Sequence, residues 1–220
     1  MKNKYFFLLL ISALSFGQIV QVKDIYPGSS SSSPSNFFDF NGTLFFRATN
    51  GADGVELWKS DGTDTGTILV KNINNTTTLA SASNPSNFTI FNNQLYFTAS
   101  NGSSANGIEL WKTDGSANGT TQLQDLRSGG SSNPQYLTIL DANTMFFSAH
   151  NGTATKLWTM NNTETISVID YTNADAINWI ESLNGKVVYC QTISGQGREL
   201  FTSDGTLTNT FRITDISGNF

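Results

Sequence analysis

The chain has 220 residues and a formal net charge of −5. Charged residues make up 13% of it, too few for a charge-rich disordered protein, and aromatic residues make up 12%, enough for a substantial core. The acidic balance and the lack of a basic cluster argue against a nucleic-acid partner. One histidine and one cysteine exclude a multi-histidine or multi-cysteine metal site and an internal disulfide.

The N-terminal segment has the three-part pattern of a secretory signal peptide. A basic start with Lys2 and Lys4 precedes an apolar run, and small residues stand just before Gln18. The apolar run is shorter than the roughly 20 residues that a membrane-spanning helix needs. We therefore predict a cleaved signal peptide over 1–17. The mature repeat domain over 18–220 is expected to have no membrane span and to be secreted or held on the outer cell surface.

One unit recurs four times along the rest of the chain. Two clear copies read Glu-Leu-Trp-Lys-Ser-Asp-Gly-Thr from Glu56 and Glu-Leu-Trp-Lys-Thr-Asp-Gly-Ser from Glu109. Another copy, from Glu199, has Phe in place of Trp, and a decayed copy starts at Lys156. The aromatic positions of successive copies lie 43 to 53 residues apart.

Each unit contains four strand-sized pieces separated by turn residues. The second piece is apolar on both faces, which is typical of a strand inside a stack of sheets. The Asp-Gly pair after the third piece predicts a tight turn. No segment shows a sustained 3.6-residue period. The first pieces begin at 36, 87, 135 and 178, the second pieces are 43–46, 94–97, 144–147 and 186–189, and the fourth pieces are 70–73, 123–126, 168–171 and 213–216.

Four short antiparallel strands per unit, at this period, indicate the blade of a β-propeller. We therefore predict an all-β chain that forms a β-propeller-like array of about four four-stranded antiparallel blades. The chain also opens with a piece of the fourth type, 22–25, so one such piece is surplus if four blades close a ring. An incomplete, open arc is the expectation, and its uncovered face and strand edge favour association or aggregation.

The repeated motif resembles that of the ELWxxDGT repeat proteins, secreted proteins of Gram-negative bacteria. Their copies read roughly Glu-Leu-Trp-x-Ser-Asp-Gly-Thr-x-x-Gly-Thr-x-Leu-Val-Lys-Asp-Ile, which 56–73 matches nearly throughout. The copy from Glu199 departs at Phe201 and at Asn209, where Gly is expected. The resemblance implies an exported propeller-like protein, often carried by a type IX secretion system and without an established activity. It also implies further repeats and a C-terminal sorting domain beyond this chain.

The acidic residue of the Asp-Gly turn suggests a calcium loop, because Asp114, Ser116 and Asn118 have the spacing of its first half. No bidentate Glu follows at the twelfth position, and the matching positions in the first copy include Thr63 and Thr65. The third copy has lost the Asp altogether. We therefore expect hairpin turns, no metal site and no cofactor.

The first pieces carry amides that we align at one repeat position, each followed by an aromatic residue. The innermost strand of a blade lines the central channel, and amides beside aromatic rings suit sugar binding. The alternative is that the amides bond to neighbouring backbones and the rings pack between blades. The candidate ligand-binding residues are Asn36, Asn87, Gln135 and Asn178.

Catalytic chemistry has little support in the sequence. His150 lies in a turn, which makes it a weak candidate for the base that a nucleophile requires, and Cys190 is expected in the core. No carboxylate pair departs from the repeat pattern as a glycosidase pair would. We predict a non-enzymatic binding, adhesion or scaffold module with an unidentified protein or glycan partner. A carbohydrate-binding propeller is the alternative, and a glycoside hydrolase is the least favoured.

Overall fold

The computed structural model describes residues 19–76, 81–103, 107–169 and 174–214. The predicted signal peptide lies outside these ranges. The described residues form four antiparallel four-stranded sheets, with strands in chain order within each sheet, and no helix. The first sheet contains β1 (Ser35–Phe40), β2 (Thr43–Thr49), β3 (Val55–Ser60) and β4 (Ile68–Lys71); the second contains β5 (Ser86–Phe91), β6 (Gln94–Ser100), β7 (Ile108–Thr113) and β8 (Thr121–Gln124); the third contains β9 (Gln135–Asp141), β10 (Thr144–His150), β11 (Thr155–Asn161) and β12 (Ile166–Ile169); the fourth contains β13 (Ala174–Leu183), β14 (Lys186–Ile193), β15 (Gly197–Ser203) and β16 (Phe211–Thr214).

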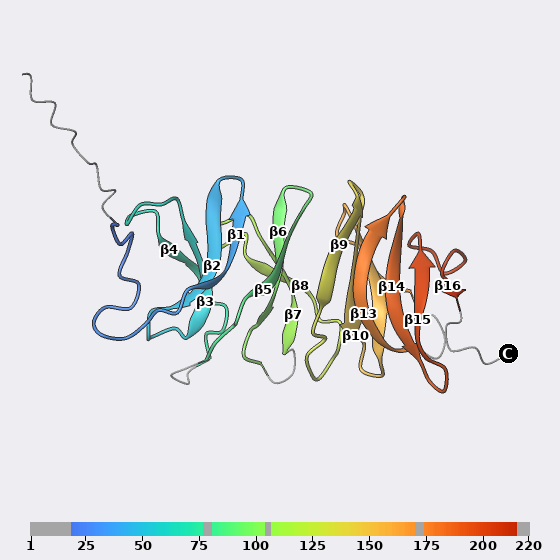
Figure 1. Ribbon diagram of the computed structural model, residues 1–220. Coiled ribbons are helices and arrows are strands. Elements are labelled where there is room, and N and C mark those ends of the chain that lie inside the picture. The colour runs from blue at the N-terminus through green and yellow to red at the C-terminus, as the bar shows by residue number, and fades with distance from the viewer. Residues whose placement is uncertain (1–18, 77–80, 104–106, 170–173, 215–220) are drawn as a thin grey trace, which may run out of the picture.

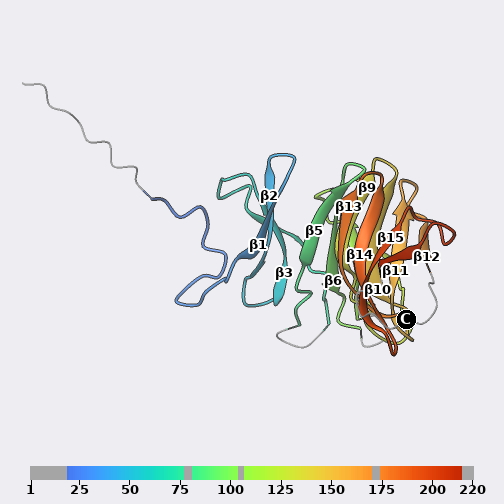
Figure 2. The ribbon, with the colours of Figure 1, turned by 45° about the vertical axis from the view of Figure 1, so that its right-hand side comes forward.

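The four sheets, called blades 1 to 4 in chain order, stand side by side (Figures 1 and 2). Their first strands are neighbours, since β1 contacts β5, β5 contacts β9 and β9 contacts β13. These strands therefore form the inner side of an arc. Blades 1 and 4 lie at opposite ends of the arc and do not close it. The prediction of an all-β, incomplete propeller is confirmed.

The core lies between the blades, because the second and third strands are apolar on both faces. Phe45 and Leu57 of blade 1 share a buried cluster with Leu95, Phe97 and Trp111 of blade 2. We call the face of a blade that packs on the following blade its forward face, and the opposite face its backward face. Equivalent clusters join Tyr96 and Leu110 to Met145 and Phe147, and Phe146 and Leu157 to Val187 and Tyr189.

In blades 1 and 2 the Glu of the repeated motif is hydrogen-bonded to the loop that leaves the blade. Glu56 is fully buried and accepts hydrogen bonds from the backbone N–H groups of Ile73 (2.9 Å) and Asn74 (3.3 Å). Ser83, in the loop toward blade 2, donates to the same carboxylate through its N–H (3.2 Å) and its hydroxyl (2.5 Å). Glu109 accepts equivalent bonds from Leu126 and Ser132. This role of the Glu is not evident from the repeat pattern. The carboxylate satisfies backbone donors that the crossover would otherwise bury unpaired.

The Asp-Gly-Thr segment forms the predicted turn. Asp61 Oδ1 accepts hydrogen bonds from Thr63 N (2.9 Å) and Thr63 Oγ1 (2.7 Å), and these bonds lower the pKa of the Asp61 carboxyl. A Cβ at Gly66 would lie 1.9 Å from Asp61 Oδ1, which explains the glycine five residues after the Asp. In the last copy Asn209 replaces that glycine, and its Nδ2 donates to Asp204 Oδ2 (2.6 Å) instead.

Candidate functional site

The four predicted amides do not share one repeat position. Gln135 pairs with Ser148 and Asn178 pairs with Cys190, whereas the residues paired at the same place in blades 1 and 2 are serines. The alignment of four amides is therefore wrong by one residue in blades 3 and 4. Tyr136 and Trp179 are the true equivalents of Asn36 and Asn87, and all four have positive φ, between 54° and 65°.

A signal for the correct alignment of blade 3 is present in the sequence, although blade 4 lacks it. Pro34, Pro85 and Pro134 each stand two residues before the positive-φ position. Counting from these prolines places Tyr136, and not Gln135, in the position of the two asparagines. Asn adopts the left-handed conformation more readily than other non-glycine residues, so the amides of blades 1 and 2 suit the backbone there.

Asn36 and Asn87 bridge neighbouring blades. Asn36 Nδ2 donates to the carbonyl oxygen of Pro85 (3.3 Å), and Asn87 Nδ2 donates to that of Pro134 (3.2 Å). Asn87 Nδ2 also lies 3.2 Å from the hydroxyl of Thr98. This is the structural alternative that the sequence left open, and it accounts for these two amides without a ligand.

Gln135 and Asn178 lie together on a polar pocket between blades 3 and 4, called the blade 3–4 pocket, with a volume of about 220 Å³. The inner strands β9 and β13 supply the two amides. Arg127 enters from the loop after β8, and His150 lies at the end of β10. The other lining residues are Ser132, Asn133, Ser148, Thr155, Ala176 and Ile177.

Amides, hydroxyls, a histidine and an arginine line the blade 3–4 pocket, and no carboxylate is among its lining residues. Gly152 N–H donates to Nδ1 of His150 (2.9 Å), so the proton of the neutral ring lies on Nε2, where it can be donated. Burial and the nearby Arg127 lower the pKa of His150, which keeps the ring neutral at pH 7. With Arg127 as a cation, the pocket suits an oxygen-rich or anionic group.

The aromatic residues divide into two kinds. Phe88 packs between blades, with ring centroids 5.9 Å from Phe38 and 5.8 Å from Phe97. Tyr136 and Trp179 are exposed at the inner side, each adjacent in sequence to an amide of the blade 3–4 pocket. The exposed aromatic residues of blades 3 and 4 therefore occupy the positions that hold Asn in blades 1 and 2, and neither of them lines the pocket.

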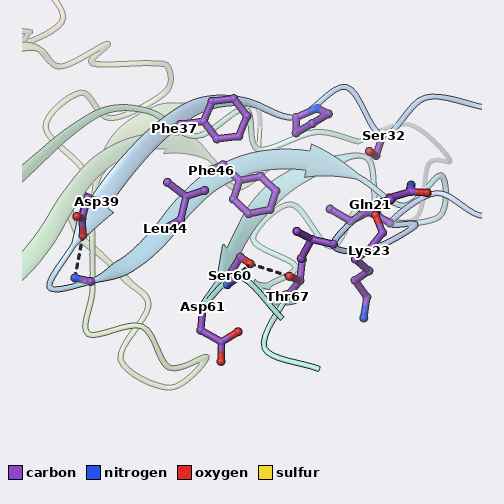
Figure 3. A pocket seen from close by; sticks show the side chains of 15 residues that line it. Gln21, Lys23, Ser32, Phe37, Asp39, Leu44, Phe46, Ser60, Asp61 and Thr67 are labelled. Atoms are coloured by element: carbon purple, nitrogen blue, oxygen red, sulfur yellow. Dashed lines mark hydrogen bonds between the residues drawn. The ribbon is translucent and has the colours of Figure 1, made fainter. Parts of the chain in front are cut away.

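A larger pocket of about 590 Å³ lies on the backward face of blade 1, which is an uncovered blade face of the kind expected in an open arc. Leu44 and Phe46 of β2 point into it, and Phe37 of β1 lies above Phe46 (Figure 3). Gln21 and Lys23 close its other side. The lining is mainly apolar, because in blades 2 to 4 the same face is covered by a neighbouring blade.

Within the described residues, no hydrogen bond joins His150 or Cys190 to a side chain that could act as its catalytic partner. Cys190 lies half-buried on β14, on the forward face of blade 4, and not in a closed core as expected. The reason is that no blade follows blade 4 in the described chain. Within the described ranges, no three His, Cys, Asp or Glu residues are grouped to hold a metal ion. The same residues include no helix able to span a membrane.

Together these features define an open β-propeller-like arc that carries the polar blade 3–4 pocket and the mainly apolar pocket on blade 1. No protein-family model and no curated protein sequence matches the chain. Solved structures share the fold at low identity. The β-propeller domain of the Trilobed protease from Pyrococcus furiosus, described as having an open velcro topology, is 13% identical with a TM-score of 0.54, over 86% of this chain and 54% of that one.

Two further structures agree with this fold. Puromycin hydrolase is 11% identical with a TM-score of 0.56, and the match covers 82% of this chain and 28% of that one. Pyrococcus horikoshii acylaminoacyl peptidase is 10% identical with a TM-score of 0.53, covering 84% and 28%. The chain thus spans about half or less of the length of these structures. At such identities the likeness shows the fold alone.

Proposed function

We propose that this protein is a non-enzymatic binding, adhesion or scaffold module that works outside the cell or on its surface. The observation that carries the proposal is the structural use of the repeated carboxylates. Glu56 and Glu109 are buried in hydrogen bonds to the crossovers, and Asp61, Asp114 and Asp204 accept bonds within their turns. The repeat therefore serves the fold, and its surfaces are left for contacts with partners.

Export is supported by the signal-like sequence of 1–17 and by the resemblance of the repeats to ELWxxDGT proteins. The route inferred from the resemblance is type IX secretion in a Gram-negative cell. Protease added to intact cells, together with fractionation of the culture, tests this. We expect the chain in the medium or cleaved at the surface, and retention inside the cytoplasm would contradict the proposal.

Carbohydrate binding is the second candidate, favoured by the meeting of Gln135 and Asn178 at the blade 3–4 pocket. Amides supply paired donors and acceptors to sugar hydroxyls, and the exposed Tyr136 and Trp179 offer apolar platforms. The pocket would take one sugar ring or part of one, with Arg127 suiting an acidic sugar.

A glycan array followed by titration of the best ligand tests the second candidate. Gln135→Ala and Asn178→Ala should each weaken binding by about tenfold or more, as loss of a partnered hydrogen bond does. Asn87→Ala is the matched control, because its amide bonds to Pro134 instead of lining the pocket. Equal losses in all three variants, or no glycan bound at all, would contradict sugar binding while leaving the scaffold proposal standing.

A further inference from the structure

The backward face of blade 1 is built like three faces that the chain itself covers. Leu44 occupies the position that Leu95, Met145 and Val187 occupy in blades 2 to 4, as the strand registers show. Those three side chains are fully buried by the preceding blade, whereas Leu44 is 39% exposed. The face of blade 1 therefore has the shape and chemistry of an inter-blade surface without the blade.

The forward face of blade 4 likewise lacks a covering blade in the described chain. Val188 and Leu200 correspond to Phe45 and Leu57, which blade 2 buries, yet both are only half-buried. Ile213 of β16 corresponds to Val70, which is 5% exposed, but is itself 45% exposed. The two ends of the arc thus expose the two halves of an interface that recurs three times within the chain.

The N-terminal segment partly fills the open face of blade 1. Ile25 packs on the buried cluster of Phe46 and Trp58, as Ile73 packs in the cluster between blades 1 and 2. Thr49 N–H donates to Ser32 O (3.0 Å), the same bond that joins Ser100 N–H to Ser83 O (2.9 Å) at the next blade. This segment lies where the crossover of a preceding blade would lie.

The segment leaves the inner part of that face open. The 590 Å³ pocket lies between the segment and β2, where strands of a preceding blade would insert their apolar side chains. Residues 22–25 belong to none of the four sheets of the described chain, whereas β16 is paired with β15. We therefore expect residues 22–25 to be displaced when a blade with its own outer strand docks on this face.

We propose that the chain assembles head to tail, with blade 4 of a second copy seated on the backward face of blade 1. Leu200 and Val188 of the second copy then lie against Leu44 and Phe46 as Leu57 and Phe45 lie against Leu95 and Phe97. A second copy is the occupant because it carries the complementary forward face, already matched to a backward face at three places in one chain. Such a heterologous contact closes a ring or extends, according to the angle between copies.

Two charge substitutions, one at each end, test the orientation. In sedimentation velocity of the chain from Gln18 at increasing concentration, the parent should associate. Leu44→Arg and Ile213→Arg should each weaken association by about tenfold or more, because a buried unpaired charge opposes the contact. Ile90→Arg is the matched control, since Ile90 is as exposed as Leu44 (39%) but lies on β5, inside the arc.

Mixing the two variants distinguishes head-to-tail assembly from other modes. The Leu44→Arg chain keeps its forward face and the Ile213→Arg chain keeps its backward face, so the mixture should regain a 1:1 dimer. The proposal would be overturned if the parent is monomeric, or if either variant alone associates as strongly as the parent. It would also be overturned if the two variants fold but do not combine. If a variant fails to fold, hydrogen exchange of the parent decides: protection should rise with concentration on both β2 and β14, and a rise on one face alone or on neither refutes the pairing.

Discussion

Replacing Trp111 by Ala should strongly destabilise the protein. Trp111 is 6% exposed and lies in the cluster between blades 1 and 2 with Phe45 and Leu57. Its Nε1–H donates to the carbonyl oxygen of Ala99 (3.0 Å). Truncation of a large aromatic residue in a packed core costs about 3–5 kcal/mol, and loss of the hydrogen bond adds about 1 kcal/mol. We expect a loss of about 4–6 kcal/mol in the free energy of unfolding.

Trp58→Ala should cost less, although Trp58 is also 6% exposed. Its cluster contains Ile25 from the N-terminal segment and residues of its own blade, but none of another sheet. Its buried Nε1 has no hydrogen-bond partner within the described residues, so no bond is lost. We expect a loss of about 2–3 kcal/mol, near the lower end for core truncations. The repeated sequence by itself predicts both tryptophans between sheets and equal losses of about 3–5 kcal/mol.

Guanidinium unfolding followed by circular dichroism and by fluorescence measures both losses, and the two probes check that unfolding is two-state. Trp158→Ala serves as a control, because Trp158 lies between blades 2 and 3 and donates to Ala149 O (2.9 Å) as Trp111 does to Ala99. It should behave like Trp111→Ala. A loss for Trp58→Ala equal to or greater than that for Trp111→Ala would refute the reasoning that a neighbouring blade supplies the difference.

Three further predictions concern the repeated motif. Gly66→Ala should cost about 1–2 kcal/mol in thermal or denaturant unfolding, because the added Cβ displaces the Asp61 carboxylate from its bonds to Thr63. Burial raises the pKa of Glu56, so the folded state binds the carboxyl proton more tightly than the unfolded state does. The free energy of unfolding should therefore fall as pH rises from the usual glutamate pKa of 4.5 toward the raised value, and Glu56→Gln should flatten that pH dependence. Thermal melts with calcium and with chelator should coincide, and a large rise with calcium would show that the Asp-Gly turns bind the ion.

The second and third strands were predictable because their pattern is set by packing on two sides. Leu-Phe-Phe and Glu-Leu-Trp leave no polar face, and only a strand between two sheets accepts such a pattern. The inner strands were predicted less well, since their side-chain positions depend on a positive-φ residue that changes identity between blades. Asn36 and Asn87 are of a residue type that favours positive φ, whereas Tyr136 and Trp179 adopt positive φ although their residue types do not favour it. The spacing from Pro134 identifies the position for Tyr136, whereas Trp179 has Ile177 in place of the proline and so lacks that signal too.

The positions and lining residues of the two pockets could not be predicted from the sequence pattern, for a different reason. A repeat alignment describes what each blade has in common, but the pocket on blade 1 arises from what blade 1 lacks, a preceding sheet. Phe37 is at the position of Phe88, which packs between blades, and yet it is exposed beside Phe46. The exposure of such a residue depends on whether a neighbouring blade covers that face, so identical residues in different blades are exposed to different extents.

A ligand site in a repeat protein is best sought where the copies differ, because the shared residues already have structural partners here. Glu, Asp, Gly and the hydroxyl residues of the motif hold crossovers and turns together. The blade 3–4 pocket is made largely of departures from that pattern. Arg127 replaces Asn74 of the first crossover, His150 replaces Ser100, and Gln135 replaces Ser86. These substitutions bring longer polar side chains and the cation of Arg127 to the blade 3–4 pocket. At the blade 1–2 junction, Arg47 stands at the position of Ser148, but its Nε is bonded to Ser35 Oγ (2.9 Å). The residues that depart from the motif are therefore the ones to substitute first in a search for a ligand.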